Sequence, residues 1–188
     1  GELLATRIKT VNSPTQVILE TPADIALAGV RWRVGMMHGI YQFTNATEQQ
    51  SGWMFEHVVV RNTSGIGLVT GYRQRGNRLH RTYFYRCRGI GALINSTNNE
   101  IDQSGSIQCG GDGVTVLRPG NRFSQFKSSS NNGSGAYVAP AAEGTAFIAC
   151  HMETNDRNGL LSLAKNVQKI GMKYTSNSQC ANGVYSDC

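Results

Sequence analysis

The sequence predicts an all-β fold, a single-stranded right-handed parallel β-helix of about seven coils of 22–28 residues. A glycine followed by an apolar or small residue recurs at steps of 28, 24, 22, 22, 24 and 24 residues. A large apolar residue, here called the anchor, stands twelve residues before six of these seven glycines. The variation in length therefore falls in the return segment, as expected for coils that stack while their loops point outward.

Each glycine is expected to head a short strand that pairs with its equivalent one coil along, about 4.8 Å away. Glycine suits this position because the chain needs either a positive φ or a close backbone approach there. The glycines are Gly39, Gly67, Gly91, Gly113, Gly135, Gly159 and Gly183. The anchors are Leu27, Phe55, Leu79, Ile101, Phe123 and Phe147, with Ile170 thirteen residues before the last glycine. Alternation along the strands places Val114, Ala136 and Leu160 in one interior file.

Two further columns follow from the same register. A second inward column, three residues after the anchor, contains Val30, Val58, Thr82, Ser104, Phe126, Cys150 and Lys173. A turn column, eight residues after the anchor, contains Gly35, Thr63, Cys87, Cys109, Asn131, Asn155 and Ser178. Small and amide side chains suit a stacked turn, since stacked Asn side chains can hydrogen-bond along the axis. Cys87 and Cys109 would lie on adjacent coils, either as a pair of thiols or as a disulfide.

Two other repetitive folds fit the sequence less well. A β-sandwich also has strands every 8–12 residues, but it has no reason to keep a twelve-residue spacing through seven units. A leucine-rich repeat has units of similar size, but it needs a regular L-x-x-L-x-L frame that the sequence lacks. We therefore favour the parallel β-helix.

Composition limits the class of protein. The chain has 188 residues, 22 of them glycine and 16% charged, as expected of one turn-rich β domain. No apolar run approaches the ~20 residues that span a membrane, so no membrane insertion is expected. The net charge of +6 serves solubility or attracts an anionic partner, and the scatter of the basic residues argues against nucleic acid. Five cysteines without a C-x-x-C pair indicate free thiols, with no metal and no cofactor.

Three repeat units carry a family resemblance: NRLHRTYFYRCRGIGALIN, NEIDQSGSIQCGGDGVTVL and NRFSQFKSSSNNGSGAYVA. They resemble the pectin-lyase-like superfamily of right-handed parallel β-helices, over roughly residues 15–188. The opening, LLATRIKTVNSPTQVILETPADIALAGVRW, looks like the early coils of bacteriophage tailspikes. The resemblance implies a homotrimeric tailspike or tail-fibre protein of a virion, which binds host surface polysaccharide outside the cell and depolymerises it if it is active. A structural or adhesive virion protein and a secreted polysaccharide lyase or hydrolase are the alternatives.

We expect one β-helix domain over residues 1–188, with a leading strand region at residues 1–22. The chain starts near a strand and stops inside the seventh coil, with no amphipathic capping helix visible. The ends of a β-helix are usually covered, because an open coil exposes unpaired strand edges. We therefore expect a segment of a longer polypeptide, or ends that neighbouring chains cover.

The column one residue after the anchor supplies the candidate catalytic residues. It contains Ala28, Glu56, His80, Asp102, Ser124, Ile148 and Gly171. Glu56 and Asp102 would lie two coils apart, about 9.6 Å between backbones, near the upper separation for the carboxylate pair of an inverting glycosidase. The candidate catalytic residues are therefore Glu56, His80 and Asp102, with His80 between the two carboxylates. The alternative is a charge ladder that only stabilises the turns, as the alternating neighbours Arg78, Glu100 and Arg122 suggest.

Outward positions four and six residues after the anchor supply the candidate substrate-binding residues. They are Arg31, Arg33, Arg61, Tyr83 and Tyr85. Aromatic rings stack on sugar faces and arginine pairs with carboxylates at two points, so this patch suits an acidic polysaccharide. A lyase would use such an arginine to neutralise a uronate and Tyr83 or His80 as the base. The alternative is contact with a neighbouring subunit, where Tyr and Arg are also common.

The middle residues of the glycine-led strands form an outward apolar stripe. The candidate subunit-interface residues are Tyr41, Val69, Leu93, Tyr137, Leu161 and Tyr185, with Thr115 among them. So long a stripe is unusual on the surface of a monomer, and contact within a homotrimer explains it best. A sugar-binding groove is the second explanation. A register error of one residue would instead turn the stripe into the core.

Overall fold

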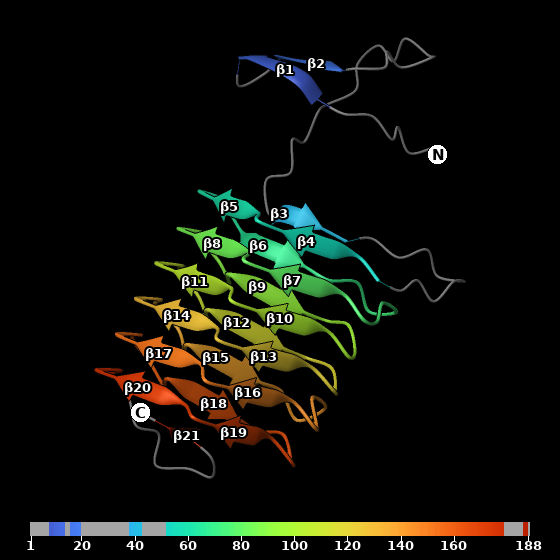
Figure 1. Ribbon diagram of the computed structural model, residues 1–188. Helices are drawn as coiled ribbons and strands as arrows, with labels where there is room; N and C mark the ends of the chain where they lie inside the picture. Colours follow the sequence, from blue (N-terminus) through green and yellow to red (C-terminus); the bar gives the residue numbers. More distant parts are fainter. Residues whose placement is uncertain (1–7, 14–15, 20–37, 43–51, 179–185, 188) are drawn as a thin grey trace. The chain divides into compact units, whose positions relative to one another are not determined.

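The computed structural model describes residues 8–13, 16–19, 38–42, 52–178 and 186–187, and describes side chains for residues 38–42 and 52–178. The chain divides into two units, residues 1–34 and 35–188, each considered by itself. In the first unit, β1 (Ile8–Ser13) pairs antiparallel with β2 (Gln16–Leu19) (Figure 1). Every regular element among the described residues is a strand. These residues therefore contain no helix that could cross a membrane.

The second unit is a parallel β-solenoid, or β-helix, in which three sheets run along the stack (Figure 1). The first sheet contains β4 (Met54–Glu56), β7 (Arg78–His80), β10 (Glu100–Asp102), β13 (Arg122–Ser124), β16 (Ala146–Ile148) and β19 (Gln168–Ile170). The second sheet contains β5 (Val59–Arg61), β8 (Tyr83–Tyr85), β11 (Gly105–Ile107), β14 (Lys127–Ser129), β17 (His151–Glu153) and β20 (Lys173–Thr175). The third sheet contains β3 (His38–Tyr41), β6 (Ile66–Val69), β9 (Ala92–Ile94), β12 (Val114–Val116), β15 (Ala136–Val138), β18 (Leu160–Ser162) and β21 (Ser186–Asp187).

The predicted all-β parallel β-helix is confirmed, with about six turns where the sequence predicted about seven. The difference lies at the last strand. β21 pairs with β18 antiparallel, so it does not continue the stack as a further parallel turn. The predicted strand headed by Gly183 falls outside the described residues, as do the predicted positions Leu27, Ala28, Val30 and Gly35.

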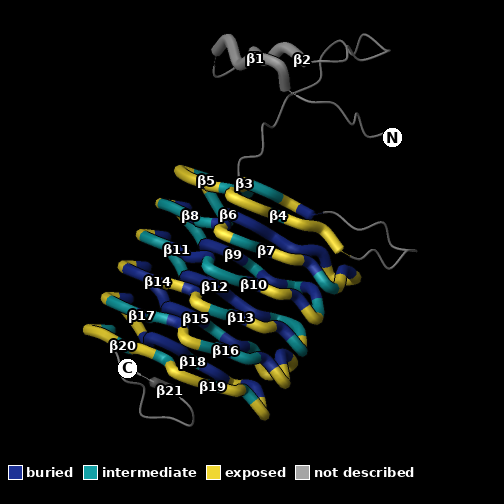
Figure 2. Tube along the Cα trace, viewed as in Figure 1, coloured by how far each residue is buried: buried dark blue, intermediate teal, exposed yellow. Residues whose placement is uncertain are grey.

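The interior file that the spacing predicted is present. Val114 lies opposite Ala136, and Ala136 lies opposite Leu160, with all three side chains fully buried. The stacked rings of Phe123 and Phe147 have their centroids 4.8 Å apart. The second inward column is also confirmed in the central turns, where Thr82, Ser104, Phe126 and Cys150 are buried. Figure 2 shows buried stretches recurring from turn to turn along the stack.

The sequence reasoning missed one further inward file, at the middle position of the second sheet. It contains Val60, Phe84, Ser106, Ser128 and Met152, all buried. Its mixture of aromatic, hydroxyl and thioether side chains carries no common sequence signal. The strands of this sheet are three residues long, too short for alternation to reveal an inward side by pattern alone.

The recurring glycines are required by close backbone approach rather than by positive φ. A Cβ on Gly113 would lie 2.5 Å from the carbonyl oxygen of Gly135, and a Cβ on Gly135 would lie 2.5 Å from that of Gly159. Real Cβ atoms do not approach a backbone oxygen so closely, so any side chain here would push adjacent turns apart. Of the two reasons that the sequence offered for glycine, the close approach is therefore the one that applies.

Positive φ angles occur instead at three corners of each turn. The corner between the first and second sheets contains His57, Arg81, Gln103, Gln125, Ala149 and Gly171. The corner after the second sheet contains Asn62, Arg86, Gln108, Ser130, Thr154 and Ser176. The corner before the first sheet contains Gly52, Gly76, Asn98, Gly120, Gly144 and Asn166. Left-handed residues at fixed positions thus define three corners in every turn.

The register predicted for the last turn is wrong by one residue. Lys169, not Ile170, lies opposite the anchor Phe147, and Ile170 is 54% exposed. Lys173 is likewise not in the inward column: it lies opposite His151 on the outer face, and Met172 packs against the core instead. The prediction counted back from Gly183, which lies outside the described residues, and the described strand after β20, β21, pairs antiparallel with β18.

The same shift moves two other predicted positions. Gly171 is a left-handed corner residue rather than a member of the column one residue after the anchor. Asn177, rather than Ser178, continues the turn column, where its side-chain oxygen accepts a hydrogen bond from Asn155 Nδ2 at 2.9 Å. Asn155 in turn accepts one from Asn131 Nδ2 at 3.0 Å, so the predicted stacking of Asn side chains is confirmed.

The two stacked cysteines of the turn column are free thiols, not a disulfide. A hydrogen bond from Cys87 to Cys109, together with burial, raises the pKa of Cys87. Burial also raises the pKa of Cys150. The same hydrogen bond lowers the pKa of Cys109, so the raised pKa within this pair belongs to Cys87. The two small side chains fill turn positions where other turns carry Thr or Asn.

Candidate functional site

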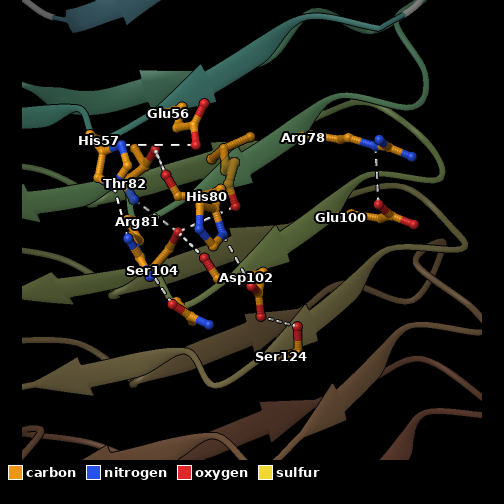
Figure 3. A network of polar contacts seen from close by, with 12 residues as sticks. Glu56, His57, Arg78, His80, Arg81, Thr82, Glu100, Asp102, Ser104 and Ser124 are labelled. Atoms are coloured by element: carbon orange, nitrogen blue, oxygen red, sulfur yellow. Dashed lines mark hydrogen bonds and ion pairs between the residues drawn. The ribbon is translucent and has the colours of Figure 1, made fainter.

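The predicted column of ionisable groups lies on the outer side of the first sheet. Glu56 lies opposite His80, and His80 lies opposite Asp102, on β4, β7 and β10. Ser124 on β13 lies next in the column. The structure thus brings together the three residues that the sequence selected, with Glu56 and Asp102 separated by one strand (Figure 3).

Asp102 makes the contacts that hold this column together. The Nδ1 atom of His80 lies 3.1 Å from one carboxylate oxygen of Asp102, and Ser124 Oγ donates to the other oxygen at 2.6 Å. Glu56 makes no such bond with His80. Its side chain is 54% exposed, and its Oε1 lies 3.9 Å from His57 Nδ1. The column is therefore a bonded group of His80, Asp102 and Ser124 beside a freer carboxylate.

The corner beside this column adds residues that the sequence reasoning missed. Arg81 Nη1 lies 3.1 Å from His57 Nε2, and Arg81 Nε donates to Gln103 Oε1 at 3.1 Å (Figure 3). Because a guanidinium has no acceptor, the first contact is a hydrogen bond only when His57 Nε2 carries no proton. The imidazole rings of His57 and His80 meet edge to face, with centroids 6.1 Å apart. The only sequence signal for this corner was a polar residue two positions after the anchor.

This arrangement can position an imidazole for proton transfer. The Asp102 carboxylate fixes one nitrogen of His80, and the other nitrogen is the atom that can accept or donate a proton. A nucleophilic triad is a different arrangement, because its histidine stands between the serine and the aspartate. Here Asp102 stands in the middle, so Ser124 is not activated as a nucleophile.

The charge-ladder interpretation also has structural support. Arg78 Nε lies 3.2 Å from Glu100 Oε2 on the next strand, in the column adjacent to His80 and Asp102. Opposite charges on neighbouring turns therefore attract along the stack. The pair is mostly exposed, so its contribution to stability is small.

The outer side of the second sheet forms an open groove of about 450 Å³. It is lined by Val59, Arg61, Asn62, Tyr85, Arg86, Ile107 and Gln108. Arg61 lies opposite Tyr85, and the rings of Tyr83 and Tyr85 are 6.2 Å apart. Two of the five predicted substrate-binding residues, Arg61 and Tyr85, therefore line this groove, and Tyr83 lies beside Tyr85. Arg31 and Arg33 lie outside the described residues.

Arg86 and Gln108 are groove residues that the sequence reasoning did not select. Both occupy the left-handed corner after the second sheet, and Arg86 Nε donates to Gln108 Oε1 at 3.0 Å. That bond holds the Arg86 guanidinium at the groove. Among the residues that the structure describes, no carboxylate lines the groove, so none of them neutralises the positive charges of Arg61 and Arg86 there.

The same face continues toward the last turns with a matched cluster. Glu153 Oε2 lies 3.4 Å from Lys127 Nζ and 3.3 Å from His151 Nε2. Glu153 is the only carboxylate at the outward positions of β5, β8, β11, β14, β17 and β20. Its pairing with two basic side chains leaves the face as a whole positive.

The outward stripe of the third sheet is less exposed than the sequence predicted. Tyr41 is 56% exposed, but Val69 is only 7% exposed. Thr115 is also buried, and its hydroxyl donates to Asp112 Oδ2 at 3.0 Å, three residues earlier in the same turn. The remaining candidates, Leu93, Tyr137 and Leu161, are half-buried, and Tyr185 lies outside the described residues.

Within the described residues, no three His, Cys, Asp or Glu side chains lie close enough together to hold a metal ion. No protein-family model matches the chain, and no curated protein matches it in sequence.

Proposed function

We propose that this chain is the β-helix of a bacteriophage tailspike or tail fibre, which binds an acidic polysaccharide on the host surface through the groove of the second sheet. The observation that carries the proposal is the pairing of unneutralised arginines with a tyrosine at that groove. A binding site of this class needs an aromatic surface for the sugar face and cations for its carboxylates. Arg61, Arg86 and Tyr85 supply both.

The groove has the size of a small-ligand site. Its volume of about 450 Å³ lies within the ~300–1,000 Å³ range of such sites. The net charge of +6 favours the approach of an anionic polymer. The buried free thiols suit a protein that folds inside a cell before it acts at the host surface, as a phage tail protein does.

The proposal includes a homotrimer. Tyr41, Leu93, Tyr137 and Leu161 form an outward apolar stripe on the third sheet, which would be covered in such an assembly. The mass of the particle in solution tests this part: we expect three chains, and fewer in a Tyr137→Glu variant. A wild-type particle of any other size would exclude the trimer.

Binding is tested with trigalacturonate as an acidic probe and maltotriose as a neutral one. Loss of a two-point arginine contact is expected to weaken trigalacturonate binding about 10-fold in Arg61→Ala and in Arg86→Ala. Arg122→Ala is the matched control, because Arg122 is an exposed arginine on the first sheet, away from the groove. Equal weakening by all three substitutions, or equal binding of the neutral probe, would contradict the proposal.

A second function, depolymerisation, is favoured by the 3.1 Å contact between His80 and Asp102. In this proposal His80 transfers a proton while Glu56 acts as the partner acid or base. Shortening of polygalacturonate chains is expected, and it is lost in His80→Gln. An unsaturated product indicates a lyase, and a new reducing end without unsaturation indicates a hydrolase. Unchanged turnover in both His80→Gln and Glu56→Gln would remove this column from catalysis.

A further inference from the structure

We propose a second site for an anionic saccharide, on the loops that lead from the third sheet to the first. It is built by Tyr72, Arg73, Arg75, Asn95 and Arg118, and it is separate from the groove of the second sheet. Going around one turn, the chain passes the first, second and third sheets and then this loop. The loop corner therefore lies across the turn from the second sheet, so one chain would hold two sugar segments on opposite sides.

The site begins with a longer loop in one turn. The return from Gly67 to the next anchor takes twelve residues, whereas the returns in the following two turns take ten. The backbone of Arg75 pairs with Thr97 in the next turn, so the additional length falls before Arg75, where Tyr72 and Arg73 stand. Tyr72 is 54% exposed, and Arg73 and Arg75 are also exposed.

Arg118 is fixed against this loop from two turns away. The Cζ atom of Arg118 lies 4.0 Å from the centre of the Tyr72 ring, in a cation–π contact. Arg118 Nε donates to Asn95 Oδ1 at 3.3 Å, in the turn between them. The guanidinium of Arg118 therefore contacts Asn95 through Nε and the Tyr72 ring through one face. Its two terminal nitrogens remain available to form a two-point pair with an anion.

The positive charge of this cluster is not matched within the described part of the chain. No carboxylate there pairs with Arg73, Arg75 or Arg118, although Arg78 and Lys127 elsewhere on the stack have acidic partners. An aromatic ring in contact with one arginine, on a loop that carries two further exposed arginines, fits a sugar that carries a carboxylate or a sulfate. A neutral sugar would use only the ring.

The test resolves the two sites by nuclear magnetic resonance of the chain with ¹³C-labelled tyrosine rings. The signals of Tyr72 and Tyr85 are assigned with Tyr72→Phe and Tyr85→Phe, and the probe is trigalacturonate. We expect both signals to shift on titration, with separate binding curves. In Arg118→Ala, and less so in Arg118→Lys, the ligand-induced shift at Tyr72 should require about 10-fold more probe, while that at Tyr85 stays unchanged.

The outcomes separate this site from the groove. A Tyr72 signal that does not move at a probe concentration that saturates Tyr85 would overturn the second site. So would an Arg118→Ala variant, folded by its circular dichroism, that still binds normally at Tyr72. A Tyr72 shift that single-stranded oligonucleotide produces at lower concentration than trigalacturonate would overturn the saccharide as occupant. Movement of Tyr72 without Tyr85 would support this site while the groove proposal fails.

Discussion

The outer faces of the first and second sheets share one register but use their charges differently. On the first sheet, Asp102 binds His80 and Ser124 of the adjacent turns. On the second sheet, Arg61 and Arg86 line a groove that contains no carboxylate. Charges on the first face are matched by partners within the chain, whereas the unmatched cations of the second face are available to a ligand. The second face is therefore the one at which we propose binding.

The sharpest test of this difference removes the core from under each face. Phe84 is fully buried on β8 between Tyr83 and the groove residue Tyr85, and Leu79 is buried on β7 between Arg78 and His80. Phe84→Ala is expected to cost ~3–5 kcal/mol of unfolding free energy and Leu79→Ala ~2–5 kcal/mol, from lost burial and the cavity left behind. Both are measured by urea denaturation.

Binding should separate the two variants although stability does not. Phe84→Ala loosens the strand that carries Tyr83 and Tyr85, so the affinity for trigalacturonate should fall. Leu79→Ala should leave that affinity close to the wild-type value under conditions where both variants remain folded. An equal loss of affinity in the two variants would show that the faces are not independent.

A smaller effect is expected from Asp102→Ala. The substitution removes the acceptor of both His80 and Ser124, at a site that is more than a third exposed. We expect a loss of about 1 kcal/mol in unfolding free energy, at the lower end for such hydrogen bonds, and no change in binding at the groove. Glu56→Ala is the control, because Glu56 makes only a distant contact with His57 and should lose almost nothing. Equal losses in the two would contradict the difference that we describe within the column.

The sequence was sufficient for the fold because the core repeats. Leu79, Ile101, Phe123 and Phe147 keep one spacing from the close-packed glycines, and both features are required by stacking. The prediction failed in the last turn. There the return segment is one residue shorter than predicted, and its composition does not reveal that change in length. Lys169 at an anchor position is the clearest example, since nothing in its residue type marks it as equivalent to Phe147.

The sites were less predictable than the fold. The column of Glu56, His80 and Asp102 followed directly from the register, but its bonding did not. Asp102 binds both His80 and Ser124, whereas Glu56 binds neither of them. This difference depends on side-chain rotamers. Arg86 was missed because a left-handed corner is normally signalled by Gly or Asn, and an arginine at positive φ carries no such signal. Arg118 was missed because its contacts span two turns.

The smallest expected effect concerns the pair formed by Arg78 and Glu100. Both side chains are more than 60% exposed, and exposed ion pairs contribute little to stability. Arg78→Ala should therefore change the free energy of unfolding by at most about 0.5 kcal/mol, and that change should vanish in concentrated salt. Urea denaturation at low and high salt measures both values. A loss above about 1 kcal/mol that persists in salt would mean that the matched charges on this face stabilise the fold more than exposed ion pairs normally do. The charge ladder would then be a main source of stability for the stack.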